Sequence, residues 1–310
     1  MDPKLAVIVP CFNNSDTIGE AIGSILSQEY DRFELHVCDN ASDDGTRDII
    51  AAITDPRLRP ALHATRVART DNWNRAYEAG FSAEYLVTLH ADDRLAPGAL
   101  RSIATAARSG PALIHGLFRH LTYEGGSIAG VRFPFRYHCT GDDFRELILL
   151  NNMVAVPGVT VRTDVFRDAG GWDPAWSFLQ DLELWWRCST YGEVIYLATH
   201  LGDQRMTKVP DPVPRHAAEH LRWTIEKLST LESPRLRHAA IDGLADYVDR
   251  LSHELADRGD VPPQLRDSIR DARDSIARGP RPRPGARHRQ RRLRLHLALR
   301  SWLRSTINPN

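Results

Sequence analysis

The sequence predicts an α/β protein in which a mostly parallel sheet is flanked by helices and followed by a helical extension and a basic tail. Three features of the 310 residues support this prediction. Short β-branched runs alternate with helical patterns in the first half, which is typical of a parallel sheet covered by helices. Acidic and polar residues follow three of these runs. The pattern becomes helical after about Pro214 and rich in proline and arginine from Gly279.

Six short apolar runs predict the strands of the sheet. They cover residues 5–10, 33–38, 58–62, 85–89, 112–116 and 193–197. Helical patterns lie between them, from Thr17, through residue 53, over 70–81, from Pro97, and over 143–150 and 180–191. Apolar residues at Ile18, Ile22 and Ile25 give the first helix one buried face, and Thr17 with Glu20 forms a capping-box pattern at its start.

Composition limits the class of protein. A hydrophobic content of 42% is enough for one large core. We expect neither secretion nor a membrane span, because no leader pattern precedes the first strand and no uninterrupted apolar run reaches about 18 residues. The four cysteines have no CxxC or metal-ligand spacing, which indicates reduced thiols in a cytoplasmic protein.

The formal net charge of zero hides an asymmetry. Nine arginines and no acidic residue follow position 280, so the first 280 residues carry a net charge of minus nine. We divide the chain into a domain of residues 1–214, a helical extension of residues 215–278, and a Pro/Arg-rich linker with a basic amphipathic tail, residues 279–310.

The basic tail has three interpretations. It could make peripheral contact with an anionic surface at the inner face of the membrane, because arginines and leucines are mixed in it. It could instead dock on the acidic body or on the partner subunit of a homodimer. Binding to nucleic acid is a weaker third interpretation, and no specific nucleic-acid site is expected.

Asp92 and Asp93 follow a predicted strand directly. In an open α/β sheet, ligands bind beyond the carboxyl ends of the strands, and paired carboxylates there suit Mg²⁺ or Mn²⁺. The alternative is structural, because either aspartate could cap the helix that begins near Pro97.

Two further aspartates have a functional and a structural interpretation each. Asp39 ends the second strand, where its carboxylate could accept a ring N–H of a base or a ribose hydroxyl, or could form an ordinary turn. Asp181 starts a helix, where it could be a general base or an anion stabilised by the helix N-terminus.

Four motifs in this order resemble those of glycosyltransferase family 2, over about two thirds of the chain. They are VIVPCFNN (7–14), VCDNASDDGT (37–46), LHADDRLAP (89–97) and FLQDLELWWR (178–187). The resemblance implies a GT-A, Rossmann-like fold and inverting transfer of a sugar from a nucleoside diphosphate, usually UDP, to an acceptor hydroxyl with a divalent cation, Mn²⁺ or Mg²⁺.

The resemblance also implies roles for single residues. Pro10, Phe12 and Asn14 would line the nucleotide pocket, and Asp39 would bind the base. Asp92 and Asp93 would correspond to the metal-binding motif, and Asp92 would also contact the donor. Asp181 would be the catalytic base, while Trp185 and Trp186 beside it would pack. Arg69 and Asn72 lie where relatives carry donor-binding residues.

The chain departs from the family pattern at three places. His90 stands where an acid is usual and is either a ribose contact or a structural histidine, and Gln180 stands where Glu is usual. The last motif has Arg205 and Lys208, which would neutralise the diphosphate, but lacks the usual histidine metal ligand, for which His200 is the nearest substitute. These departures motivate an alternative function, a catalytically inactive nucleotide-sugar-binding or scaffold protein.

Overall fold

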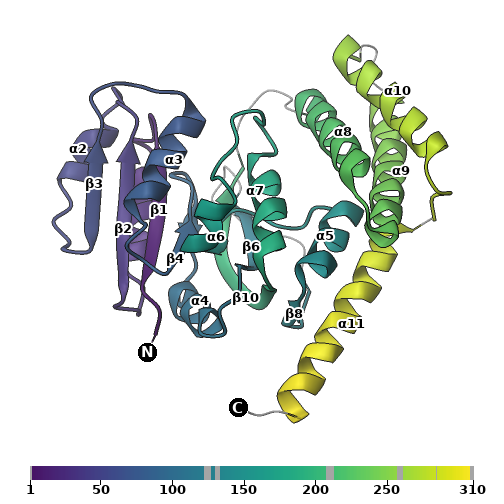
Figure 1. Cartoon of the computed structure of the whole chain (residues 1–310). Helices are drawn as coiled ribbons and strands as arrows, with labels where there is room; N and C mark the ends of the chain where they lie inside the picture. The colour runs from purple at the N-terminus through teal and green to yellow at the C-terminus, as the bar shows by residue number, and fades with distance from the viewer. Residues whose placement is uncertain are drawn as a thin grey trace.

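The computed structural model describes residues 2–121, 127–129, 133–206, 213–256, 261–283 and 285–307. It has an α/β fold in which helices cover both faces of one sheet (Figure 1). The strands are β1 (Leu5–Cys11), β2 (Phe33–Asp39), β3 (Leu58–Leu62), β4 (Tyr85–Thr88), β5 (Arg94–Leu95), β6 (Leu113–Leu121), β7 (Ser127–Ala129), β8 (Tyr137–Cys139), β9 (Thr160–Arg162) and β10 (Val194–Arg205). The helices are α1 (Ile18–Leu26), α2 (Thr46–Ala51), α3 (Arg69–Ala79), α4 (Ala99–Ala107), α5 (Gly141–Leu150), α6 (Thr163–Asp168), α7 (Gln180–Cys188), α8 (Val213–Thr230), α9 (Pro234–Ala256), α10 (Pro263–Arg278) and α11 (Ala286–Ile307).

The sheet confirms the predicted fold class. Its order is β3-β2-β1-β4-β9-β6-β10-β5, with β7 paired to β6 and β8 to β10. The strands β3, β2, β1 and β4 are parallel, whereas β9 is antiparallel to both of its neighbours. The half of the sheet formed by β3, β2, β1 and β4 is therefore parallel, and the sheet becomes mixed beyond β4.

Alternating residues of β1 divide the core between the two faces. Leu5, Val7 and Val9 pack with α1, α2 and α4, while Ala6 and Ile8 pack in a second cluster with α3, α6 and α7. All five side chains are fully buried, as expected for a strand covered on both faces. The predicted buried face of α1 is confirmed, because its three isoleucines are also fully buried.

The predicted capping box at the start of α1 is wrong. The side chain of Thr17 makes no capping bond and instead lies 3.5 Å from the carbonyl oxygen of Asn14. Glu20 points away from the helix end and forms ion pairs with Arg94 and Arg205. A long-range pair of arginines therefore takes the carboxylate that a local cap would have used.

Strand β10 continues beyond the predicted end at residue 197. Its register with β6 shifts between Leu197 and Gly202, which indicates a β-bulge. The bulge interrupts the two-residue alternation of side chains, so the sequence pattern did not predict the second part of the strand. Gly202 is required there, because a Cβ atom would lie 2.7 Å from the carbonyl oxygen of Arg94. Beyond the bulge, Arg205 contacts Asp92 and Asp93, the acidic motif after β4. The sequence also gave no signal for β5, β7, β8, β9 and α6.

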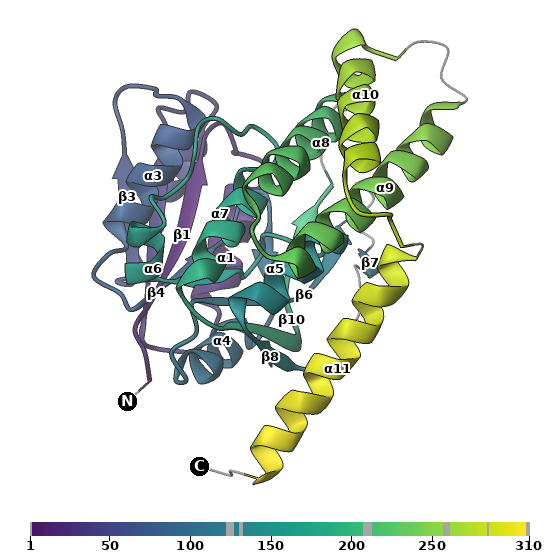
Figure 2. The same cartoon turned by 45° about the vertical axis from the view of Figure 1, so that its right-hand side comes forward.

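The helical extension shares a core with the sheet. Trp223, Leu236 and Ile241 belong to the same hydrophobic cluster as Leu113 and Trp185. At Gly243, a Cβ atom would lie 1.8 Å from the carbonyl oxygen of Leu149, so α9 contacts α5 backbone to backbone. One hydrophobic core thus crosses the predicted boundary at residue 214, and Figure 2 shows α8 beside α7.

The first half of the tail docks on the body, one of its three interpretations. Arg283 and Arg289 pair with the buried carboxylate of Asp242, at 3.0 and 2.9 Å. Arg294 is buried, and its guanidinium lies 4.3 Å from the ring centre of Phe133. Helix α11 then runs along β8 and α5 (Figure 2). None of the described helices has the length and apolarity needed to cross a bilayer.

Candidate active site

The carboxyl ends of β1, β2 and β4 meet at one edge of the sheet, where two loops lock together. The first loop, residues 12–17, follows β1, and the second, residues 40–45, follows β2 and leads into Thr46 at the start of α2. Three backbone amides of the first loop donate to side-chain oxygens of the second: Asn13 to Ser42 Oγ (2.8 Å), Asn14 to Thr46 Oγ1 (2.8 Å) and Ser15 to Asp44 Oδ2 (2.9 Å). The hydrogen bonds from Thr46 and Ser15 lower the pKa of Asp44. The loops form one preorganised wall.

Asp39 lies beneath this wall. Its side chain is fully buried, and its Oδ2 accepts the backbone N–H of Ser42 at 3.1 Å. The guanidinium of Arg47 lies 3.8 Å away, too far for a hydrogen bond. Asp39 therefore organises the second loop, and direct contact of its carboxylate with a base requires the loops to shift.

The other predicted donor residues of β1 lie at the same edge. Pro10 is buried in the strand, and Asn14 is half-buried, with its Oδ1 accepting the backbone N–H of Phe12 at 3.0 Å. The half-buried ring of Phe12 carries the guanidinium of Arg66 at 4.0 Å from its centre. Sequence analysis missed Arg66, because nothing in residues 63–68 marks it as a partner of a residue 54 positions earlier.

Asn72 supports this edge from below. It is buried, with its Nδ2 3.4 Å from the carbonyl oxygen of Cys38, the residue before Asp39. Its Oδ1 accepts from Arg75, which also reaches Asn40. In this arrangement Asn72 holds the end of β2 and does not line an open pocket.

The acidic motif after β4 gathers three possible metal ligands. One ligand atom from each of His90, Asp92 and Asp93 lies within 4.8 Å of the other two, and in the described part of the chain no other such group of three forms. Asp93 is buried and accepts the backbone N–H of Arg205 at 2.8 Å through Oδ1. The predicted acidic pair is thus brought together, with His90 added to it.

Two ligand atoms of this group lack hydrogen-bond partners. Asp93 Oδ2 and His90 Nε2 are buried and have no hydrogen-bond partner. Burial, and then the charge of Asp92, raise the pKa of Asp93 well above its ordinary value, while burial lowers the pKa of His90. A neutral imidazole and two carboxylates are ligands that Mn²⁺ accepts, so the residues fit a divalent cation.

Arg205 lies at the acidic motif, whereas His200 lies outside the possible metal group. The Arg205 guanidinium donates to the carbonyl oxygen of Asp92 at 2.9 Å and pairs with Glu20, so its charge supports the acidic motif. His200 Nε2 lies 2.8 Å from Asp203 Oδ1 and is not part of the possible metal group, where His90 takes the third position. Lys208 lies outside the described residues.

Asp181 opens α7 and is half-buried. Its Oδ1 accepts the backbone N–H of Leu182 at 2.7 Å. Burial is the main cause that raises its pKa to about 6; the hydrogen bond from Leu182 opposes this shift, and the negative charge of Glu219 adds a smaller contribution in the raising direction. A carboxylate with this pKa is ionised near neutral pH and is a stronger base than an ordinary aspartate.

Glu183, the second acid of α7, is held differently. Its carboxylate is buried and accepts from Trp223 Nε1 at 2.5 Å and from Lys227 Nζ at 2.9 Å. These bonds anchor α8 to α7 and leave Asp181 as the candidate base. The predicted packing roles of Trp185 and Trp186 are confirmed, because both are buried in the core.

Helix α3 connects the acidic motif to Asp181. The ring of Trp73 lies 5.0 Å from that of His90, and the Arg69 guanidinium lies 5.7 Å from Trp73. Arg69 also donates to the carbonyl oxygen of Ser177 and to Gln180 Oε1. Arg69 therefore links the loop before Asp181 to α3 and, through Trp73, to His90.

The family model described as Glycosyl transferase family 2 matches residues 6–168. This match covers more than half of the chain and includes the loops after β1 and β2 and the acidic motif. The chain belongs to glycosyltransferase family 2. The match ends before Asp181, so the family model does not cover the candidate base.

Two relatives differ in how far they align with the chain. An uncharacterized protein of Mycobacterium tuberculosis, MT1568, is 28% identical over 222 residues, which span 66% of the chain and 68% of the relative. The GalNAc(5)-diNAcBac-PP-undecaprenol beta-1,3-glucosyltransferase of Campylobacter jejuni is 32% identical over 117 residues, 37% of the chain and 38% of that enzyme.

Solved structures of S. aureus TarS have the same fold. TarS 1–349 superimposes with a TM-score of 0.67 and 16% identity, covering 88% of the chain and 81% of TarS. Its complex with UDP-GlcNAc gives a TM-score of 0.62 and 15% identity, covering 88% of each chain. At this identity the likeness concerns the fold alone, and it confirms the GT-A prediction.

Proposed function

We propose that this family 2 glycosyltransferase transfers a sugar from UDP to an acceptor hydroxyl with inversion, using a divalent cation and Asp181 as the base. The observation that carries the proposal is the group of His90, Asp92 and Asp93, in which His90 and Asp93 have unpartnered buried ligand atoms. It lies at the sheet edge that also bears the loops after β1 and β2, which we propose as the nucleotide loops. Position and donor chemistry agree with a diphosphate site.

Asp181 would accept the proton of the acceptor hydroxyl. Its Oδ1 is held by the Leu182 amide, so Oδ2 is the oxygen left for the proton. The acceptor oxygen forms a bond to the anomeric carbon as the bond from that carbon to the diphosphate oxygen breaks on the opposite face, which inverts the centre. A bound cation would supply Lewis-acid stabilisation of the departing diphosphate.

The donor is proposed from the chemistry of the edge and from relatives. The Phe12–Arg66 pair offers an aromatic face and a positive charge, which suit a base and a phosphate. A TarS structure contains UDP-GlcNAc, and an Escherichia coli relative, 32% identical over 94 residues, is named a UDP-Glc:alpha-D-GlcNAc-diphosphoundecaprenol beta-1,3-glucosyltransferase. We therefore propose UDP-GlcNAc and UDP-glucose as the first donors to test.

The acceptor is proposed to be linked to a lipid diphosphate, as the names of the Campylobacter and Escherichia relatives state for those enzymes. The structure supplies a surface that suits this proposal. On α11, Arg287, Arg291 and Arg292 are exposed opposite the docked face, with Leu295 55% exposed beside them. A basic face with an apolar residue attracts anionic membranes.

Vesicle co-sedimentation tests this membrane contact. A truncation would uncover the core packed against α11, so the full chain carrying Arg291→Glu and Arg292→Glu is compared with one carrying Arg270→Glu and Arg273→Glu on α10. We expect loss of pelleting with phosphatidylglycerol vesicles for the α11 variant alone. Equal pelleting of both variants, or no pelleting of the unmodified chain, would exclude this contact.

Donor turnover and UDP affinity test the proposed function. We expect Mn²⁺-dependent binding of UDP by calorimetry and slow release of UDP from UDP-GlcNAc or UDP-glucose in water, accelerated by acceptor. The alternative, an inactive nucleotide-sugar-binding protein, predicts the same UDP affinity and no turnover of either donor. Absence of both binding and turnover would contradict both functions.

A further inference from the structure

The loop before Asp181 has a binding partner in the helical extension. Residues 177–179 precede α7, whose N-cap residue Leu179 has no side chain that can cap the helix. Three successive backbone amides of this loop instead donate to the carboxylate of Glu219 on α8. The donor-acceptor distances are 2.7 Å from Ser177, 2.5 Å from Phe178 and 2.9 Å from Leu179.

We propose that Glu219 is a positioning residue for Asp181: by binding three successive amides, it fixes the loop that aims the base at the acceptor. This inference rests on the proposed role of Asp181 as the base. Glu219 does not replace Asp181, because its carboxylate is already occupied by the loop amides.

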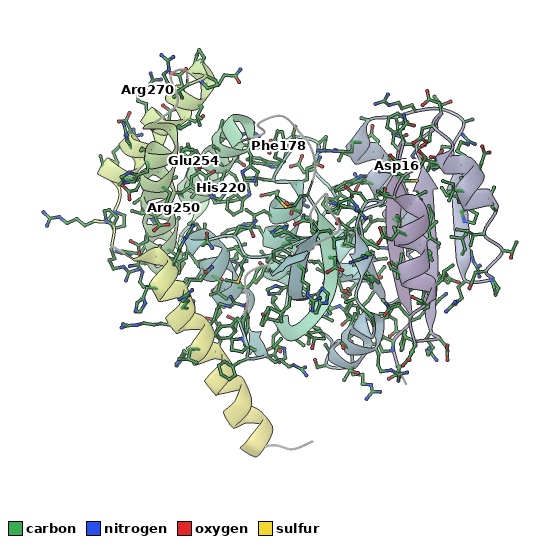
Figure 3. All side chains as sticks on the ribbon, turned by 180° about the vertical axis from the view of Figure 1, so that it is seen from behind. Asp16, Phe178, His220, Arg250, Glu254 and Arg270 are labelled. Atoms are coloured by element: carbon green, nitrogen blue, oxygen red, sulfur yellow. The ribbon has the colours of Figure 1, made fainter. Side chains whose placement is uncertain are left out.

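A second residue of α8 holds the same loop. Arg222 donates to the carbonyl oxygen of Ala175 at 2.9 Å, and its guanidinium lies 4.2 Å from the ring centre of Trp176. The helix thus takes up N–H and C=O groups of one loop with residues one turn apart. Figure 3 shows the labelled Phe178 close to α8, and its ring lies 6.4 Å from that of His216 on that helix.

The opposite side of the loop is held by α3. Arg69 donates to the carbonyl oxygen of Ser177, and Gln180 Nε2 donates to Thr70 Oγ1 at 2.5 Å. The loop is therefore clamped between a helix of the donor half and a helix of the extension. A loop held on both sides keeps its geometry when substrate arrives, which is the property a base loop needs.

Glu219 also acts on Asp181 through its charge. The anion stabilises the N-terminus of α7 and at the same time raises the pKa of Asp181. Removal of this charge should therefore lower the pKa of Asp181 and move the acid limb of the activity profile to lower pH. A residue that only stabilised the fold would change the rate without moving that limb.

A cavity of about 680 Å³ adjoins the clamp. Ser177 and Phe178 line it from the loop, Glu219 and Glu226 from α8, and Gln264 from α10. Glu226 lies seven residues beyond Glu219 on α8 and provides a matched control, because Glu226→Gln removes a charge from the same cavity and leaves the acceptor of the three amides in place.

The test measures kcat and kcat/KM between pH 5 and 8 with UDP-GlcNAc or UDP-glucose, whichever the unmodified chain consumes faster. We expect Glu219→Gln to lower kcat on the order of 100-fold and to shift the acid limb toward lower pH, because the mutation removes a negative charge that raises the pKa of Asp181. Glu219→Asp keeps the charge but shortens its reach, so it should lower kcat and leave the limb in place. Glu226→Gln should keep kcat within about twofold.

Thermal melting and UDP affinity show that each variant is folded. If Asp181→Asn keeps its turnover, Asp181 is not the base and the proposed function fails first. If Asp181→Asn is inactive but Glu219→Gln keeps both kcat and the limb, the positioning role is contradicted. A fall in kcat with an unmoved limb for Glu219→Gln would reduce Glu219 to a structural residue and also overturn the inference.

Discussion

The proposed nucleotide loops after β1 and β2 and the loop before Asp181 are held by contacts of different range. Bonds between residues 29 to 32 positions apart join the nucleotide loops to each other. The loop before Asp181 is bound by Glu219, about 40 residues later, and by α3, more than 100 residues earlier. The two loops after β1 and β2 are therefore joined within one short stretch of the chain, whereas the loop before Asp181 depends on α3 and on the helical extension.

This difference predicts that mutations in the two regions change different measured quantities. Changes at the nucleotide loops and the acidic motif should alter UDP or cation affinity. Changes at α7 and α8 should alter turnover while UDP affinity stays constant.

Asp181→Asn should give the largest effect on turnover. Loss of a general base lowers the rate on the order of 100-fold to 10,000-fold, while the similar shape of asparagine preserves the surroundings. UDP affinity, measured by calorimetry with Mn²⁺, should stay unchanged. Turnover within a few fold of the unmodified chain would exclude Asp181 as the base. A loss of UDP affinity as large as the loss of turnover would show that Asp181 also contributes to UDP binding, against the predicted separation.

Asp92→Ala and Asp93→Ala should affect binding more than any change at α7 does. Each removes a carboxylate from the possible metal group, so we expect Mn²⁺-dependent UDP affinity to fall about tenfold or more, roughly 1.4 kcal/mol. His200→Ala is the control, because His200 is paired with Asp203 and should leave the affinity unchanged. Affinity that survives EDTA and both aspartate variants would contradict the metal site.

Trp223→Phe tests the anchoring of α8 on α7 through stability. The change removes one donor from the buried carboxylate of Glu183, which should lower the free energy of unfolding by about 1–3 kcal/mol. UDP affinity should not change. Tyr191→Phe, which removes the hydroxyl of an exposed tyrosine, should cost less. Urea unfolding measures both, and equal costs would argue against a special role of the α7–α8 contact.

Arg66→Ala should have the smallest effect, confined to the donor side. Loss of an exposed cation over Phe12 should weaken UDP binding by about 0.5–1 kcal/mol, a factor of about two to five. Arg59→Ala on β3 provides a control of equal charge. If Arg66→Ala kept normal UDP affinity but shifted the pH profile of kcat, Arg66 would act on the base and not on UDP binding, which would contradict this prediction.

The contrast between local and long-range contacts also explains what the sequence could predict. β1, β2, β3 and α1 were predicted closely, because a buried strand and an amphipathic helix are written in adjacent residues. β9 and the second part of β10 were missed, since a three-residue strand and a bulged strand lack a clear period. The motifs likewise predicted that Asp92 and Asp93 lie at the edge with the nucleotide loops.

Partners of the site residues were harder to predict than the residues themselves. Arg205 was assigned to the diphosphate, but its ion pair with Glu20 joins positions 185 residues apart. His200 was chosen for its place in the sequence, and the bulge in β10 sets its ring against Asp203. The role of Glu219 was not predicted from the sequence. The spacing of Glu219, Trp223 and Lys227 nevertheless places them on one face of α8, where all three contact α7 or the loop before it.

The pH dependence of kcat/KM for donor turnover tests the central claim most directly. Asp181 must be ionised to accept a proton, so activity should be full above its raised pKa and fall as the pH drops through about 6. The account predicts an acid limb with an apparent pKa near 6 in the unmodified chain, and no such limb in the residual activity of Asp181→Asn. A flat profile between pH 5 and 7, or the same limb in Asp181→Asn, would contradict it.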